Sequence, residues 1–116
     1  MLYKLGSYDG VRKLLGVIDE KVINDICLGI SRLECAYGEN FDYDNIGGYS
    51  VFVETHDDLL LFKEIVDYDN HLCEWASIIE DSEYISSLFV LNNDFAIVLY
   101  LHISIAPESI KSVLNY

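Results

Sequence analysis

The sequence is poor in basic residues, in proline and in long apolar runs. It has seven lysines and arginines against twenty acids, and a single proline among 116 residues. Seven bases spread along a chain cannot form a nucleic-acid-binding patch. Phosphate-binding loops are glycine-rich and precede a helix, whereas Gly47-Gly48 precedes a predicted strand. We therefore expect no direct contact with DNA or RNA.

The apolar runs are too short for a membrane-spanning helix, and the cysteines are not placed for a disulfide framework. The longest apolar run, Phe95–Leu101, has seven residues, and a bilayer-spanning helix needs about 20. Cys27 and Cys35 are eight residues apart on a predicted helix, which separates them by about 12 Å, too far for a disulfide. The first six residues lack the apolar segment of a signal peptide. We expect reduced thiols, no membrane contact and a cytoplasmic protein.

Apolar residues are plentiful, and their spacing predicts one α+β domain over residues 1–116. They make up 52% of the chain, enough for a core without disulfides or metal. Helical periodicity predicts a long helix over about 19–37 and a second over about 56–66. Thr55 and Asp58 are spaced as a capping box at the start of the second helix. A strand is expected over 49–54, between these helices.

The clearest motif is a β-hairpin with arms at about 84–91 and 95–103. Asn92-Asn93-Asp94 joins the arms, and these residue types tolerate the backbone angles of a tight turn. Pro107 suits the first turn of a last helix over about 107–115. With short helices at 10–15 and 73–80, we expect the order α-α-β-α-β-β-α and a short mixed sheet packed against helices. Residues 2–5 are open to an extra edge strand.

The negative charge is concentrated in the middle of the chain. The segment from Leu33 to Glu83 contains fourteen acids and one base, Lys63, and so accounts for the whole net charge of −13. Tyrosines are interleaved with these acids, and tyrosine is typical of protein interfaces. A field of one sign steers oppositely charged partners to a surface. If these acids form one face, that face is suited to a basic protein.

Metal and nucleophile chemistry have weaker support. The segments 42–45 and 67–70 read Asp-Tyr-Asp-Asn and resemble fragments of a calcium loop, but Val53 and Ile78 stand where the loop needs glutamate. His71 and Cys73 have no second pair at zinc spacing. On a helix, their separation by two residues also directs the side chains apart, which disfavours a thiolate–imidazole pair. We expect no metal, no cofactor and no enzyme activity.

Three functional hypotheses follow. The first is an inhibitor or immunity-type protein that covers the basic, nucleic-acid-binding site of a toxin nuclease or defence enzyme. In size and charge the chain is similar to bacterial immunity proteins and phage-type inhibitors, although no motif carries the likeness. The expected partner-binding residues are Glu39, Asp42, Tyr43, Asp44, Asp57, Asp58, Asp67, Tyr68 and Asp69. Carboxylates would replace phosphates, and Tyr43 and Tyr68 would be apolar anchors.

The second hypothesis is a structural or homo-oligomeric domain, in which the apolar hairpin pairs across an edge with another copy. The third is a small hydrolase that uses His71, Cys73 or a pair of carboxylates. Binding to a basic protein is expected of the first hypothesis alone. A dimer that is insensitive to salt is expected of the second.

Overall fold

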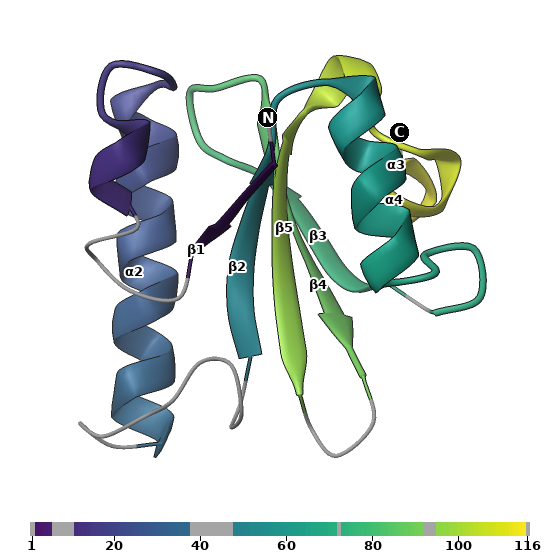
Figure 1. Ribbon diagram of the computed structural model, residues 1–116, viewed down its shortest axis with the longest axis horizontal. Helices are drawn as coiled ribbons and strands as arrows, with labels where there is room; N and C mark the ends of the chain where they lie inside the picture. Colours follow the sequence, from purple (N-terminus) through teal and green to yellow (C-terminus); the bar gives the residue numbers. More distant parts are fainter. Residues whose placement is uncertain (1, 6–10, 38–47, 72, 92–94, 116) are drawn as a thin grey trace.

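The structure is a computed structural model that describes residues 2–5, 11–37, 48–71, 73–91 and 95–115, without the side chains of 32–37 and 48. A five-stranded sheet runs through the middle, with helices on both of its sides (Figure 1). The elements in chain order are β1 (Leu2–Leu5), the 3-10 helix η1 (Arg12–Leu14), α2 (Glu20–Tyr37), β2 (Gly48–Val53), α3 (His56–Ile65), β3 (Cys73–Ile78), β4 (Tyr84–Val90), β5 (Ala96–His102), the 3-10 helix η3 (Ile103–Ile105) and α4 (Glu108–Val113). The predicted α+β class is confirmed.

The sheet is mixed, with the strand order β1-β2-β5-β4-β3. All neighbouring pairs are antiparallel except β2 and β5, which run parallel. A parallel pair needs a long crossover connection, and here α3, β3 and β4 lie in the sequence between the two strands. The predicted hairpin is confirmed as β4 and β5, with Tyr84 opposite His102 and Val90 opposite Ala96. The residues 92–94 of its turn lie outside the described part.

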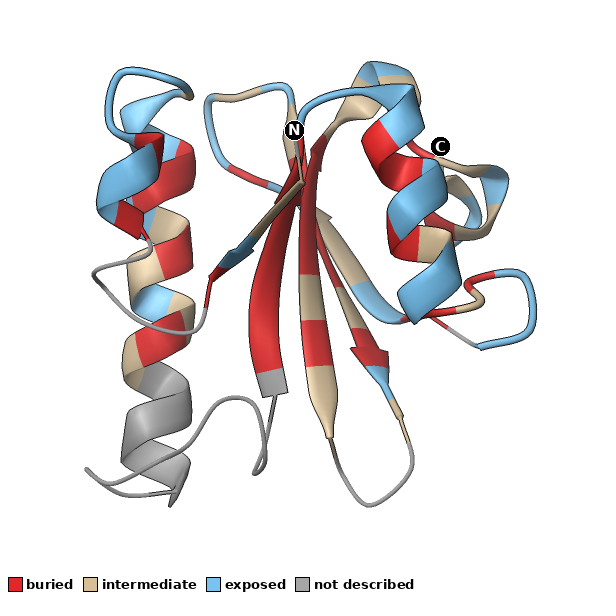
Figure 2. Ribbon diagram, in the orientation of Figure 1, coloured by how far each residue is buried: buried red, intermediate tan, exposed pale blue. Residues whose placement is uncertain are grey.

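The two faces of the sheet are covered by different helices. On one face α2 approaches β5 closely: a Cβ built on Gly29 would lie 3.3 Å from the Tyr100 hydroxyl. On the other face α3 packs Phe62 against Phe89 of β4, with ring centroids 5.9 Å apart, and α4 lies on the side of α3 (Figure 1). The burial colours follow this layering, since β2, β5 and the inward sides of α2 and α3 are buried (Figure 2).

Local sequence accounts for the two long helices. In α2, Val22, Ile26 and Ile30 recur at helical spacing and are fully buried on the side that faces the sheet. The capping box predicted for α3 is confirmed: the Thr55 hydroxyl accepts from the Asp58 amide at 3.2 Å. In return the Asp58 carboxylate accepts from the Thr55 amide at 3.1 Å. No helix in the described part of the chain has the length and apolar character needed to cross a bilayer.

Two expectations need correction, and one open question is answered. The predicted helix over 73–80 is wrong, because Cys73–Ile78 forms β3, paired antiparallel with β4. A register shift between Cys73 and Trp75 interrupts the two-residue alternation that would have indicated a strand. The short helix expected at 10–15 is only the 3-10 turn η1, and residues 2–5 do form an edge strand.

The hairpin cannot supply the edge-to-edge interface of the second hypothesis. β5 lies between β2 and β4, and β4 lies between β5 and β3. Both strands therefore have hydrogen-bonded neighbours on each side, and the edges of this sheet are β1 and β3.

Candidate functional site

The outer side of α3 combines large apolar side chains with carboxylates. Leu60, Leu61 and Ile65 are 48%, 52% and 49% exposed. Asp57 and Glu64 are also exposed, and these five positions recur at the three- and four-residue spacing of one helix face. The opposite side of the same helix buries Leu59 and Phe62 in the core. α3 is thus apolar on both sides, although only one of them packs against the sheet.

The turn that follows α3 continues the acidic character of this face. The Asp67 carboxylate accepts from the Asn70 side-chain amide at 2.6 Å and from the Asp69 backbone amide at 3.3 Å. These hydrogen bonds, with the Asn70 side chain making the largest contribution, lower the pKa of Asp67. Asp69 forms an ion pair with Lys63 of α3. We call Asp57, Leu60, Leu61, Glu64, Ile65, Asp67 and Asp69 together the α3 surface.

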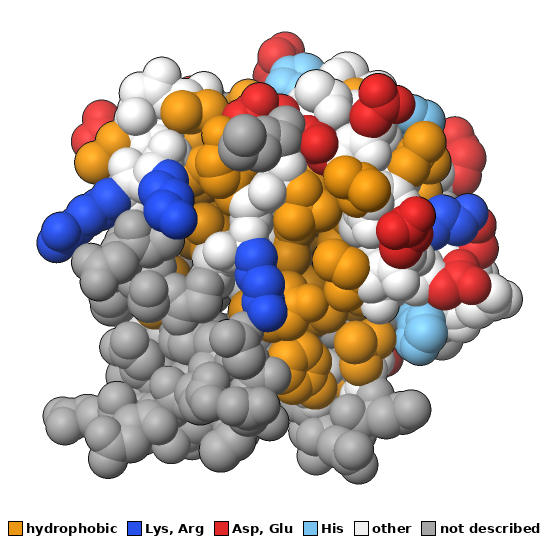
Figure 3. Space-filling model, in the orientation of Figure 1, with side chains coloured by type: hydrophobic (Ala, Val, Ile, Leu, Met, Phe, Trp, Pro, Cys, Tyr) orange, Lys and Arg blue, Asp and Glu red, His pale blue; other side chains and the backbone are white. Residues whose placement is uncertain are grey.

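Figure 3 shows how the charges are distributed over the face of the molecule that carries α3. Acidic, hydrophobic and basic side chains are mixed over the α3 side, where Lys63 is paired with Asp69, and further lysines and arginines lie over η1 and β1 (Figure 3). Lys4, Arg12 and Lys13 are exposed there. The α3 surface therefore presents negative charge at some distance from this basic region.

Two of the residues expected to bind a partner have structural roles instead. Tyr68 is only 7% exposed, and the Lys63 ammonium lies 5.1 Å from the centre of its ring. The expectation of an exposed tyrosine anchor at this position is therefore wrong. Asp58 is also buried, and its carboxylate is occupied by the capping box of α3. The exposed apolar side chains beside the acids are those of leucine and isoleucine.

The other expected residues divide between the α3 surface and the undescribed part. Asp57, Asp67 and Asp69 lie on the α3 surface. Glu39, Asp42, Tyr43 and Asp44 lie outside the described residues, so their role stays a prediction.

The acidic residues that the structure describes do not form one continuous face. Glu80 lines a groove with Asp25 of α2, and Asp81 contacts Lys21 of the same helix, with 3.8 Å between the ammonium and the carboxylate. α2 and α3 cover opposite faces of the sheet, so these acids are separated from the α3 surface. Tyr49, one of the tyrosines interleaved with the acids in the sequence, is buried as well and cannot contribute to an exposed binding surface.

Cys73 is placed as a core residue. Its thiol donates to the Trp75 carbonyl oxygen at 3.2 Å, while the His71 ring contacts the Asp67 carbonyl oxygen at 3.1 Å. Burial, the largest influence, raises the pKa of the Cys73 thiol. A thiol held protonated is a poor nucleophile, so this pair offers little to the hydrolase hypothesis.

A second group of polar side chains surrounds His102. Its Nδ1 is 2.8 Å from the Ser104 hydroxyl and accepts from the Ser104 amide at 3.1 Å. Its Nε2 is 3.1 Å from a Glu83 carboxylate oxygen. The amide contact caps η3, and this local role accounts for the arrangement. In the part of the chain that the structure describes, no three histidine, cysteine or acidic side chains are grouped to hold a metal ion.

Comparison of the chain with known protein families, with curated proteins and with solved structures gives no significant match.

Proposed function

We propose that this protein is an acidic protein-binding domain of the inhibitor or immunity type, acting in the cytoplasm. Its α3 surface covers the basic, nucleic-acid-binding site of a toxin nuclease or a similar enzyme. The observation that carries the proposal is the composition of the outer side of α3, where three half-exposed aliphatic side chains stand among carboxylates.

The apolar part of this surface supports a protein partner. A helix of a globular protein normally turns its apolar side chains toward the core, whereas α3 also presents Leu60, Leu61 and Ile65 on the side away from the sheet. Contiguous exposed apolar residues with a polar rim are typical of protein interaction sites. Leu60, Leu61 and Ile65 supply the apolar centre, and the acids flank it.

The charged part of the surface supports a basic partner. Asp57 and Glu64 lie on the same helix face as the leucines, and Asp67 and Asp69 follow in the next turn. Lysines and arginines that donate hydrogen bonds to phosphates can donate to carboxylates in the same geometry. The net charge of −13 also accelerates encounter with a positively charged surface. A second copy of this chain is less well suited, because a symmetric contact through α3 places carboxylates against carboxylates.

The proposal is tested by capture and identification of the partner from extracts of the source cell. The bait is compared with a variant that carries Leu61→Ser and Glu64→Lys, and with a control that carries Leu15→Ser and Glu20→Lys. Leu15 and Glu20 are exposed, and Glu20 lies on α2, which covers the opposite face of the sheet from α3. We expect a basic protein to bind the wild type and the control but not the α3 variant. Retention of a neutral or acidic protein, or equal retention by all three baits, would contradict the proposal.

A further inference from the structure

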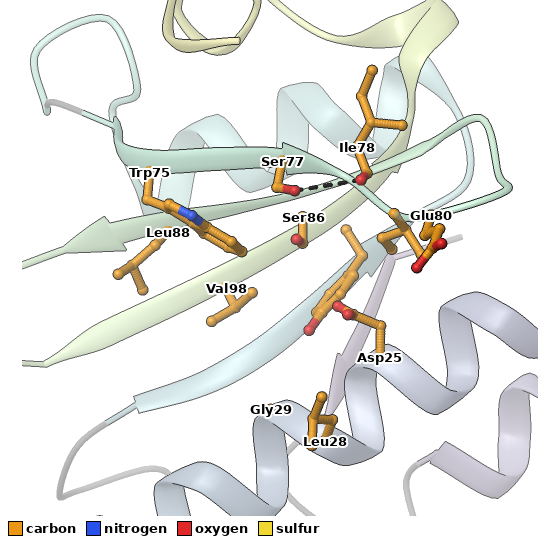
Figure 4. A pocket seen from close by; sticks show the side chains of 12 residues that line it. Asp25, Leu28, Gly29, Trp75, Ser77, Ile78, Glu80, Ser86, Leu88 and Val98 are labelled. Carbon is orange, nitrogen blue, oxygen red and sulfur yellow. Dashed lines mark hydrogen bonds between the residues drawn. The ribbon is translucent and has the colours of Figure 1, made fainter.

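A groove lies between α2 and the half of the sheet that α2 leaves uncovered. It has a volume of about 510 Å³, within the range of about 300–1,000 Å³ that is usual for small-molecule sites. Its floor is the face of β3, β4 and β5 that points toward α2, and its wall is α2 itself (Figure 4). The groove lies on the opposite side of the sheet from the α3 surface.

One end of the groove is apolar. Trp75 of β3 is 47% exposed, and its ring lies across the sheet near Leu88 and Val98 (Figure 4). Within the described ranges no helix or strand covers this indole, although tryptophan contributes a large apolar area wherever it is buried. Leu28 of α2 adds an exposed aliphatic side chain at the wall.

The other end of the groove is acidic. Asp25 of α2 and Glu80, which follows β3, face this end (Figure 4). Lys21, one turn before Asp25, is held by Asp81, since its ammonium donates to the Asp81 carbonyl oxygen at 3.2 Å. Within the described chain, neither Asp25 nor Glu80 has an ion-pair partner. Among the residues whose side chains the structure describes, the groove lining contains these two carboxylates and no lysine or arginine.

We propose that this groove binds a small amphipathic organic cation, with an aromatic or aliphatic body and one ammonium group. The body packs on Trp75, Leu88 and Val98, and the ammonium contacts Asp25 and Glu80. Charge complementarity selects this ligand class, because a cation finds two unpaired carboxylates and an anion meets repulsion from both. The indole face adds a favourable contact for a cation that reaches it. A second copy of the chain is disfavoured, since each groove carries its own acids.

The chain contains its own probe for this site. Trp75 is the only tryptophan, so fluorescence excited at tryptophan-selective wavelengths reports on the groove alone. Titration with 2-phenylethylamine, 2-phenylethanol and 3-phenylpropionate varies the charge on a similar apolar body. We expect saturable changes in emission, with the cation bound about fivefold more tightly than the alcohol, as two partly exposed ion pairs predict. The anion should bind most weakly.

Variants locate the binding and keep the probe. Asp25→Asn with Glu80→Gln should make the amine and the alcohol bind equally. Leu28→Lys places a competing cation at the wall and should abolish binding of the amine. Its matched control is Leu60→Lys on α3, because Leu28 and Leu60 are helix positions that are each 48% exposed. Thermal unfolding of each variant checks that the fold is retained.

Several outcomes would overturn the inference. Equal affinity for the three ligands would show that the carboxylates do not contribute to binding. Unchanged Trp75 emission at every ligand concentration would show that the groove does not bind these ligands. If Leu60→Lys lost amine binding to the same extent as Leu28→Lys, the amine would bind somewhere other than the groove. A dimer in sedimentation, together with Trp75 emission that shows a shielded indole, would mean that a second copy of the chain occupies the groove. None of these results depends on the partner of the α3 surface.

Discussion

At the scale of single residues, Asp58 shows how one carboxylate stabilises a helix. Burial raises its pKa, but the hydrogen bonds that the carboxylate accepts, those from Thr55 among them, outweigh burial, so the pKa lies below its ordinary value. A carboxyl group whose pKa is lowered by folding stabilises the native state above its unfolded pKa of about 3.9. That contribution is lost as the pH falls through the folded pKa.

The variant Asp58→Asn tests this contribution. At pH 7 we expect it to lower the free energy of unfolding by roughly 1 kcal/mol, the usual size of a capping interaction. The difference from the wild type should shrink as the pH falls below about 4, because the wild-type carboxylate is then protonated in both states. Urea unfolding at pH 7 and pH 3 measures it. An equal difference at both pH values would show that charge is not involved.

The thiols make a second prediction at this scale. Burial raises the pKa of Cys73, whereas Cys27 is only partly buried on α2. Because the thiolate is the reactive form, we expect iodoacetamide at pH 8 to modify Cys27 at least about tenfold faster than Cys73. Peptide mapping by mass spectrometry gives both rates. The difference should vanish in urea, and equal rates in the folded protein would contradict the placement of Cys73.

At the scale of elements, α3 has one side that supports the fold and one that does not. Phe62 is fully buried and Leu61 is about half exposed. Phe62→Ala should therefore cost about 3–5 kcal/mol of stability, and Leu61→Ala should cost less than about 0.5 kcal/mol. Urea midpoints at constant m-value measure both. A large loss in Leu61→Ala would mean that the outer side of α3 already packs within the chain.

The elements that sequence predicts well are those with a strong local pattern. The bounds of α2, β2 and α3 follow from apolar periodicity and the Thr55 cap, and the hairpin follows from two apolar arms around an Asn-Asn-Asp turn. β3 was mistaken for a helix because Cys73-Glu74-Trp75-Ala76 has no strand alternation across its register shift. Its hydrogen bonds come from β4, a tertiary contact that local sequence does not encode.

The binding surface was less predictable than the fold. An acidic segment in the sequence says nothing about which face each carboxylate reaches, and α2 and α3 direct them to opposite sides of the sheet. Tyr68 looked like an anchor by residue type but is buried beneath Lys63. The exposure of Leu60 and Leu61 was not predicted, because it depends on which side of α3 meets the sheet.

At the scale of the whole molecule, negative charge and exposed apolar area coincide on the α3 surface, where Lys63 is paired with Asp69, while further bases lie toward η1 and β1. A basic partner bound there should be held by apolar contacts at the centre and by ion pairs at the rim. Rim charges affect the association rate and its salt dependence more than the final affinity. The two contributions are therefore separable by experiment.

The most direct test is the salt dependence of the dissociation constant between the purified chain and its captured partner. We expect the affinity of the wild type to fall steeply with salt, and the double variant Asp57→Asn, Glu64→Gln to show weaker affinity at low salt and a clearly shallower dependence. The control Glu20→Gln, on α2 across the sheet from α3, should match the wild type. Identical salt dependence in the wild type and the α3 variant would contradict the assignment of binding to α3.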